Sequence, residues 1–517
     1  MASPVVRAAG RLVGAIDAGT SSSRFILFDT AGRAVASHAE DFAQLNPQPG
    51  WVEHEPETYL STVRTCIAEC LRKAGVSKDD VAAVGVANQR ETTVAFDVTT
   101  GKPLCNAIVW CDNRTTGTVD KLIAKTEKKS ATAFLDRSGL PLSTYFSAIK
   151  MRWMMDNVPE VEQAVKAGTC RFGTVDSWLM WHLTGKKAFV TDVTNASRYM
   201  LMNLAERRWD PVLLDFFGVP EETLPEIRSS SEVYGHFADG PLEGTPIAGC
   251  LGDQQAALVG QRCFSAGQSK NTYGTGCFLL VNMGPKVCRS SHGLVSTVGY
   301  QLGPDAKPAY ALEGSIAIAG VALQWLRDNM KLAESYKEIS DLAASVPDTG
   351  DVYFVTAFSG LYAPHWRDDA RGCIVGMTQY TRREHICRAA MEAVCFQTRD
   401  VLDAVVKDAA DSFDLKELSV DGGMTKSECM VQTQADLLGV PVVRPKLAEA
   451  TALGGAAAAG LAVGFWDSVE DYVSKTAPPT EGDGANDVFE PQVDEEERER
   501  RLARWHKAIE KSLDWAE

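Results

Sequence analysis

The sequence predicts an α/β fold with at least two domains that face each other across a cleft. Its 517 residues are too many for one compact domain. Short apolar runs typical of strands alternate with stretches of helical periodicity, which is the pattern of α/β proteins. A strand–turn–strand pattern near the N-terminus also returns about halfway along the chain. Two halves of similar plan are therefore expected.

The first predicted element is a β-hairpin. Residues 12–17 (LVGAID) and 24–29 (RFILFD) are apolar runs joined by a turn of glycine, threonine and serines. A helix is predicted over Tyr59–Ala74, because apolar residues recur there on one face. These residues are Leu60, Val63, Ile67 and Leu71. Residues 81–88 (VAAVGVAN) then predict a buried strand.

The second half begins with a similar hairpin. Residues 269–282 (SKNTYGTGCFLLVN) again predict a strand, a glycine–threonine–glycine turn and an apolar strand. This repetition places the boundary between the halves near Gly260–Ala266. A third turn of the same type, residues 419–427 (SVDGGMTKS), includes the end of another apolar run.

The C-terminal part is predicted to end in an acidic linker and a helix. Residues 451–464 (TALGGAAAAGLAVG) are small enough for close helix packing. The stretch Pro478–Glu499 is rich in proline, glycine and acidic residues, which is typical of a solvated linker or surface loop. The amphipathic helix that follows is expected to dock on the body of the protein. Its apolar face is formed by Leu502, Trp505, Ile509 and Leu513.

Composition excludes several classes of partner. There are 52 basic and 68 acidic residues, a net charge of −16, which argues against a general nucleic-acid surface. The sequence has no apolar run close to the roughly 20 residues of a membrane span. The thirteen cysteines are dispersed and form no CxxC pair, as in proteins with reduced thiols. A cytoplasmic protein without membrane insertion is expected.

The three turns can bind phosphate groups. Consecutive backbone N–H groups and hydroxyls in a glycine turn form an anion nest, and Asp17 at a strand end can hold Mg²⁺. An ordinary hairpin is the alternative for the first turn alone. The turns at Gly274–Gly276 and Gly422–Gly423 strengthen the nucleotide interpretation. The sequence has no Walker A motif and no full GxGxxG, so P-loop and dinucleotide-binding folds are disfavoured.

Two further clusters can serve an alcohol acceptor. Asp253 lies just before the predicted boundary, where a carboxylate could take the proton of an attacking hydroxyl. The alternative for Asp253 is a helix N-cap. Arg90 and Glu91 follow an apolar strand and could donate to and accept from adjacent hydroxyls. A surface salt bridge is the alternative for that pair.

Taken in order, these motifs resemble the FGGY family of carbohydrate kinases from about Val13 to Trp466. Two further segments, residues 145–157 and 372–392, look like the two signatures of that family. The remaining blocks are DAGTSSSR, PGWVEHEPE, NQRETT, NAIVWCDNRT, FGTVDSWL, TDVTNASR, GDQQAALVGQ, KNTYGTGCF, AIAGVALQWLRD and VDGGMT.

The resemblance implies two actin- and hexokinase-like (ribonuclease H-like) domains around a central ATP cleft. The expected limits are 11–262 for an N-terminal domain with the acceptor and phosphate site, and 263–477 for a C-terminal nucleotide domain. Residues 478–517 would form the acidic linker and the C-terminal amphipathic helix. A homo-oligomer, specifically a dimer, is the expected assembly.

The activity that the resemblance implies is transfer of the γ-phosphate of ATP to a terminal hydroxyl of glycerol, the first step of glycerol catabolism. Asp253 would be the general base, and Asp17 with Asp253 would hold Mg²⁺. Residues expected to bind glycerol are Arg90, Glu91, Trp110, Tyr145, Asp253, Gln254 and Phe278. Residues expected to bind ATP are Thr20, Ser21, Ser22, Arg24, Thr275, Gly320, Gln324, Gly423 and Ser427.

Alternatives to this activity remain open. A related kinase could act on a pentulose or on gluconate, although a larger sugar needs a roomier pocket. An actin- or Hsp70-like ATPase would hydrolyse ATP without an acceptor, and a scaffold protein would carry an inactive site. The sequence also departs from the family pattern at Ser427, where asparagine is common, and at Ser143–Thr144, where Asp-Pro is often found.

Overall fold

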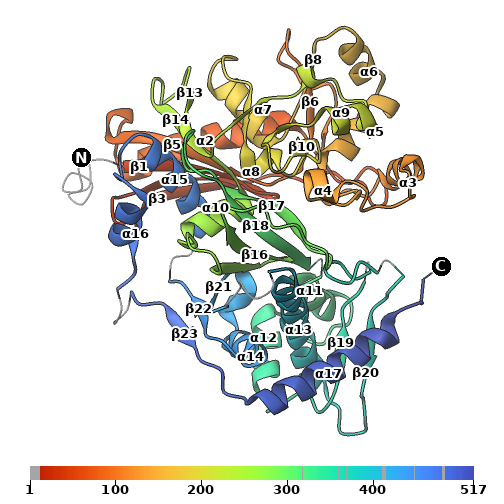
Figure 1. The fold of residues 1–517 in the computed structure, drawn as a ribbon. Helices are drawn as coiled ribbons and strands as arrows, with labels where there is room; N and C mark the ends of the chain where they lie inside the picture. Colours follow the sequence, from red (N-terminus) through yellow and green to blue (C-terminus); the bar gives the residue numbers. More distant parts are fainter. Residues whose placement is uncertain are drawn as a thin grey trace.

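The computed structural model describes residues 12–516 except 317, 359, 368, 410–414, 447–448, 480–481 and 483. Two large mixed sheets organise the molecule, one in each of the two bodies seen in Figure 1. The strands of the first sheet lie in the order β13 (Ser231–His236), β14 (Pro246–Gly252), β5 (Val81–Asn88), β1 (Leu12–Ala18), β2 (Ser22–Phe28) and β3 (Ala34–Asp41).

The second sheet repeats the plan of the first. In each sheet an antiparallel hairpin continues into a third antiparallel strand on one side, and parallel strands follow on the other. The expected α/β fold with two domains is confirmed. The strand order is β17 (Val295–Tyr300), β18 (Ala309–Ile316), β16 (Cys277–Gly284), β15 (Ser269–Tyr273), β21 (Leu418–Asp421), β22 (Val442–Arg444) and β23 (Asp487–Phe489).

Both faces of the first sheet are buried, which explains why its central strands are almost continuously apolar. On one face pack α2 (Pro56–Ala74) and α7 (Val175–Leu183). Three residues of the predicted apolar stripe of α2, Val63, Ile67 and Leu71, are buried, Leu60 is partly buried, and the helix begins three residues before the predicted start. The opposite face is covered by α10 (Asp253–Gly260) and α15 (Ala450–Ala462).

Helix α15 therefore comes from the C-terminal part of the chain and packs on the N-terminal sheet, as Figure 1 shows beside β5 and α10. Glycines permit the close approach. A Cβ atom on Gly454 would lie 1.8 Å from the carbonyl oxygen of Ala256 in α10, and one on Gly85 would lie 1.9 Å from that of Gly455. The predicted close packing of this small-residue segment is confirmed.

Short elements surround the first sheet. They are β4 (Glu53–His54), β6 (Val94–Asp97), β7 (Ala107–Ile108), β8 (Cys170–Gly173), β9 (Val190–Asp192), β10 (Met202–Asn203), β11 (Arg208–Trp209), β12 (Glu226–Arg228), α3 (Thr116–Lys125), α4 (Leu135–Ser138), α5 (Ser147–Asn157), α6 (Pro159–Lys166), α8 (Val193–Ala196) and α9 (Pro211–Phe217).

The second sheet is covered by helices grouped around the 27-residue α13 (Arg383–Ala409). The others are α11 (Gly320–Asp328), α12 (Tyr336–Ala344), α14 (Glu428–Leu438) and α17 (Glu495–Ser512), with the short strands β19 (Tyr353–Val355) and β20 (Cys373–Val375). Helix α16 (Val469–Thr476) belongs instead with the first body, next to α15.

The predicted acidic linker is more structured than expected. Within Pro478–Glu499, residues 487–489 form edge strand β23, paired with β22, and α17 begins at Glu495. Helix α17 docks as predicted: Trp505 is fully buried, stacks on Phe396 at 5.2 Å and donates to Asp400 at 2.8 Å. Composition alone could not reveal β23, because an edge strand with one neighbour tolerates polar residues.

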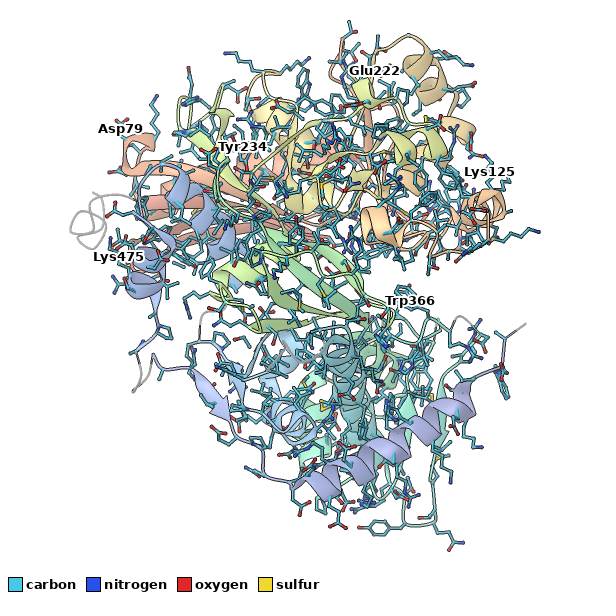
Figure 2. The ribbon with its side chains drawn as sticks, in the orientation of Figure 1. Asp79, Lys125, Glu222, Tyr234, Trp366 and Lys475 are labelled. Atoms are coloured by element: carbon cyan, nitrogen blue, oxygen red, sulfur yellow. The ribbon has the colours of Figure 1, made fainter. Side chains whose placement is uncertain are left out.

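The outer surface carries charges of both signs. Asp79, Lys125, Glu222 and Lys475 extend from the periphery of the first body (Figure 2). Among the described helices, none combines the length and the apolar character that a bilayer span requires.

Candidate active site

The first phosphate-binding candidate is the turn between β1 and β2. The N–H of Gly19 donates to the carbonyl of Ser22 at 3.0 Å, and the side chains of Thr20, Ser21 and Ser22 keep solvent exposure. Asp17 lies at the end of β1, where its backbone is in register with Arg24. The turn therefore offers hydroxyls and a carboxylate at one edge of the first sheet.

Asp17 lies in a cluster of negative charge. The pKa of Asp17 is raised to about 7, mainly by burial and also by the nearby carboxylates of Asp253 and Glu449, with Arg24 acting in the opposite direction. Arg24 itself donates to Glu449 at 2.8 Å, just before α15. Arg24, which is expected to bind phosphate, is therefore paired with the carboxylate of Glu449, 425 residues later in the sequence.

The second and third turns lie together at one end of the second sheet, because β15 and β21 are parallel neighbours with Thr272 opposite Asp421. The backbone carbonyl of Thr275 accepts from the N–H of Ala319 at 3.1 Å, and the backbone carbonyl of Gly274 accepts from the N–H of Gly320 at 3.0 Å. A Cβ atom on Gly320 would lie 2.6 Å from the Gly274 carbonyl oxygen. The start of α11 is therefore fitted against this turn.

The remaining residues expected at the nucleotide differ in their accessibility. Gly423 is exposed, next to Gly422, whose φ of 95° is in the left-handed region. Gln324 is an exposed residue of α11. Ser427 is buried instead, and its hydroxyl accepts from Ser340 at 2.8 Å. The structure gives the Ser427 side chain a role in joining α12 to α14.

Asp253 is the first residue of α10, and Gly252 is the N-cap, so the N-cap alternative is wrong. Its side chain is about one quarter exposed and lies 3.5 Å from Nε of Arg90. Burial raises the pKa of Asp253, while the charges of Arg90 and Lys270 act in the opposite direction. A carboxylate that remains accessible between two cations can both bind a hydroxyl and accept its proton.

Arg90 and Glu91 are not a surface salt bridge. Both side chains are 2% exposed, and their closest N–O distance is 3.9 Å. Arg90 donates to both oxygens of Glu313, and Glu91 accepts from Arg198 at 2.5 Å. Glu91 also has a φ of 58°, an uncommon backbone conformation for a residue other than glycine, and such outliers are often found at functional sites.

Three aromatic rings form the apolar side of the site. Trp110 contacts Tyr145 and Phe278 edge to face, with ring centroids 5.8 and 5.9 Å apart. Its Nε1 donates to the hydroxyl of Thr20 at 3.0 Å, which joins the acceptor side to the first turn. All three rings are partly exposed, and Phe278 comes from the second sheet. Residues of both halves of the chain therefore form this group of three rings, which we call the ring box.

Sequence analysis missed three buried charged residues at the site: Arg198, Lys270 and Glu313. Lys270 donates to Gln254, an expected glycerol ligand, and to Thr272 at 3.0 Å. Burial lowers the pKa of Lys270 to about 8. For Glu313 the available signal was a charged residue inside the otherwise apolar strand β18. Lys270 gave no such signal, because β15 (SKNTY) is largely polar.

Two sheets of equivalent plan carry glycine turns, and the accessible carboxylate of Asp253 lies beside buried charges and three aromatic rings, an arrangement typical of a phosphotransferase. The N-terminal domain of the FGGY family of carbohydrate kinases matches residues 12–260 of this chain, and the C-terminal domain of the family matches residues 269–463. The chain belongs to the FGGY family of carbohydrate kinases.

Curated relatives and a solved structure agree with this assignment. A probable glycerol kinase of Dictyostelium discoideum is 49% identical over 97% of this chain and 98% of its own length. A glycerol kinase of Acidiphilium cryptum is 51% identical over 98% of this chain and all of its own. The crystal structure of Plasmodium falciparum glycerol kinase with ADP is 37% identical, with a TM-score of 0.89 over 97% of this chain and 98% of that one.

Proposed function

We propose that this chain phosphorylates glycerol with ATP, producing sn-glycerol 3-phosphate and ADP. The observation that carries the proposal is the small mixed site: the buried pair Arg90 and Glu91, the accessible Asp253 and the box of three rings. A three-carbon triol offers three hydroxyls to the polar groups and one short carbon edge to the rings. The named relatives, about half identical over nearly all of both chains, support the same substrate.

The proposed mechanism is in-line transfer. A terminal oxygen of glycerol forms a bond to the γ-phosphorus as the bond from that phosphorus to the β,γ-bridging oxygen breaks, and ADP leaves. The hydroxyl proton passes to a carboxylate oxygen of Asp253. Thr20, Ser21 and Ser22 would hold the phosphates from the first sheet, with Thr275, Gly320 and Gly423 acting from the second. The rings of Trp110 and Phe278 would exclude water, which otherwise competes with glycerol.

The residues present fit a divalent cation. Burial raises the pKa of Asp17, the carboxylates of Asp253 and Glu449 act in the same direction and Arg24 opposes them, so carboxylate oxygens gather at this point. Oxygen ligands of this kind suit Mg²⁺. Asp17 and Asp253 would hold the ion, directly or through water. When bound, it would neutralise phosphate charge.

The first test is an acceptor panel. We expect glycerol to have a higher kcat/KM than dihydroxyacetone, xylulose, ribulose or gluconate, because the ring box leaves room for a short carbon chain. ADP release with ATP and Mg²⁺ is measured for each compound and without acceptor. A pentulose with a higher kcat/KM than glycerol would contradict the proposal. Equal ADP release without acceptor would indicate an ATPase instead.

A second test separates the metal from the base. In Asp17→Asn we expect a loss of activity that raising Mg²⁺ partly restores, because the amide weakens metal binding without removing the acceptor carboxylate. Initial rates of the variant and the wild type are compared across a Mg²⁺ series at saturating ATP. A variant whose rate is reduced by the same factor at every Mg²⁺ concentration would show that Asp17 does not serve the metal.

A further inference from the structure

Four buried charges lie beside the acceptor site: Arg90, Glu91, Arg198 and Glu313. Each side chain is at most 2% exposed, and two positive charges balance two negative ones. Three of the four belong to the first half of the chain. Glu313 is the exception, since it projects from β18 of the second sheet. The described charge network therefore crosses from one half to the other.

Glu313 is the centre of this network. It accepts from Nη1 and Nη2 of Arg90 at 2.5 and 2.8 Å, and from Nη2 of Arg198 at 3.2 Å. Burial raises the pKa of Glu313, but the charges of Arg198 and Arg90 outweigh it and hold the pKa at about 2. The carboxylate is thus ionised at neutral pH, and two-point pairing of this kind fixes the plane of a guanidinium.

The pairing with Glu313 decides how Arg90 faces the substrate. Both terminal nitrogens of Arg90 point to Glu313, so Nε is left toward Asp253 at 3.5 Å and Glu91 at 3.9 Å. Arg198 connects Glu313 to Glu91. Its Nη2 donates to Glu313, and its Nε donates to Glu91 at 2.5 Å. Two of the three charged residues expected to bind glycerol, Arg90 and Glu91, are therefore oriented, directly or through Arg198, by one carboxylate of the opposite half.

We propose that Glu313 is a positioning residue of the acceptor site, through which the second half of the chain orients Arg90 and Glu91 for glycerol. The proposal rests on the proposed function. Glu313 itself need not touch the substrate: its carboxylate oxygens are occupied by the two arginines. Removing its charge would leave Glu91 and the partly exposed Asp253 as the carboxylates facing the two guanidinium groups, and would free the terminal nitrogens of Arg90 from their partner.

The test is Glu313→Gln, which keeps the shape and one acceptor oxygen. We expect the KM for glycerol to rise about 10- to 100-fold, the range in which losing one or two charge-assisted hydrogen bonds falls. We expect the KM for ATP to stay within about twofold, because the nucleotide turns do not contact the network. Steady-state kinetics with each substrate varied separately gives both values.

The chain supplies a matched control in Glu392. This glutamate of α13 is also buried and also accepts from two arginines, Arg388 and Arg501, at 2.9 and 2.7 Å. Glu392→Gln therefore makes the same chemical change away from the acceptor site. We expect a lower melting temperature but an unchanged KM for glycerol. An equal rise of that KM in both variants would overturn the positioning role.

A second variant keeps the proposal testable if Glu313→Gln does not fold. Glu313→Gln combined with Arg198→Gln restores the balance of buried charge, since one carboxylate and one guanidinium are removed together. We expect a folded protein, by thermal melt, whose KM for glycerol stays raised because Arg90 remains unanchored. A wild-type KM for glycerol in either folded variant would overturn the proposal.

The failure of the proposed function would be visible separately. If the wild type releases no more ADP with glycerol than without it, the substrate assignment fails. The KM of Glu313→Gln and that of the wild type are then compared with the best acceptor of the panel. The ratio of these two KM values alone decides whether Glu313 positions the acceptor site.

Discussion

Asp253→Asn is expected to lower kcat by at least about a hundredfold while changing the KM for ATP far less. The hydroxyl of glycerol is a poor nucleophile, and its proton must leave as the bond to phosphorus forms. A positioned base contributes on the order of 10²–10⁴-fold to such a step. The amide is nearly isosteric and can still accept a hydrogen bond from glycerol, but it cannot take the proton.

The structure makes this substitution easy to interpret. Gly252 is the N-cap of α10, and the carboxylate of Asp253 accepts from the N–H of Gln254 at 2.7 Å, a hydrogen bond that the side-chain oxygen of asparagine can also accept. Thermal melts of variant and wild type check that both are folded, and steady-state kinetics gives kcat. A folded variant that retains more than roughly a tenth of wild-type kcat would refute the role of base. The carboxylate would then bind substrate only, and the proton would pass to the phosphate.

Gly454→Ala is expected to be the most damaging small substitution in the core. Its Cβ would lie 1.8 Å from the carbonyl oxygen of Ala256, so α15 and α10 would have to move apart. Overpacking of this kind costs about 3 kcal/mol at the upper end of the usual range. Ala256 is three residues after Asp253 on the same short helix, and a displacement of about 1 Å at a reacting group can cost 10²-fold in rate.

The neighbouring glycine supplies the control. A Cβ on Gly455 would lie 3.5 Å from the nearest described atom, the backbone nitrogen of Ala87, which is an ordinary contact. Since alanine favours helix over glycine by about 1 kcal/mol, Gly455→Ala should be neutral or slightly stabilising. Melting temperature and kcat are measured for both variants. Equal melting temperatures would show that the helices adapt without strain.

Much of the fold was predictable because it depends on local patterns. The hairpin of β1 and β2, the stripe of α2 and the docked C-terminal helix all follow from the spacing of apolar residues. The turn at Gly274–Gly276 was predictable for the same reason, since it repeats the first hairpin. The limits 11–262 and 263–477 remain predictions, and α15 packs on the first sheet although it lies within the second range.

The charge network was not predictable, because it depends on contacts between distant segments. Arg90 and Glu313 are 223 residues apart, and no spacing rule joins them. The same holds for Arg24, whose partner Glu449 lies at the other end of the chain. The sequence placed Ser427 at a position where the family is expected to bind the nucleotide. It could not show that the Ser427 hydroxyl accepts a hydrogen bond from the hydroxyl of Ser340. A local sequence pattern indicates which residue types are present, whereas their ion-pair and hydrogen-bond partners can be identified only from the tertiary structure.

The position of α15 has a consequence for the nascent chain on the ribosome. The last central strand of the first sheet, β14, ends at Gly252, but the helix that covers one face of that sheet ends at Ala462. At about 5–20 residues per second, translation of the intervening segment takes about 10–40 s. During that interval the apolar face of Val13, Ala15 and Ile26 can be covered by α10 but lacks the part of its native cover that α15 supplies. The N-terminal half emerges first but can complete its core only after α15 has been translated.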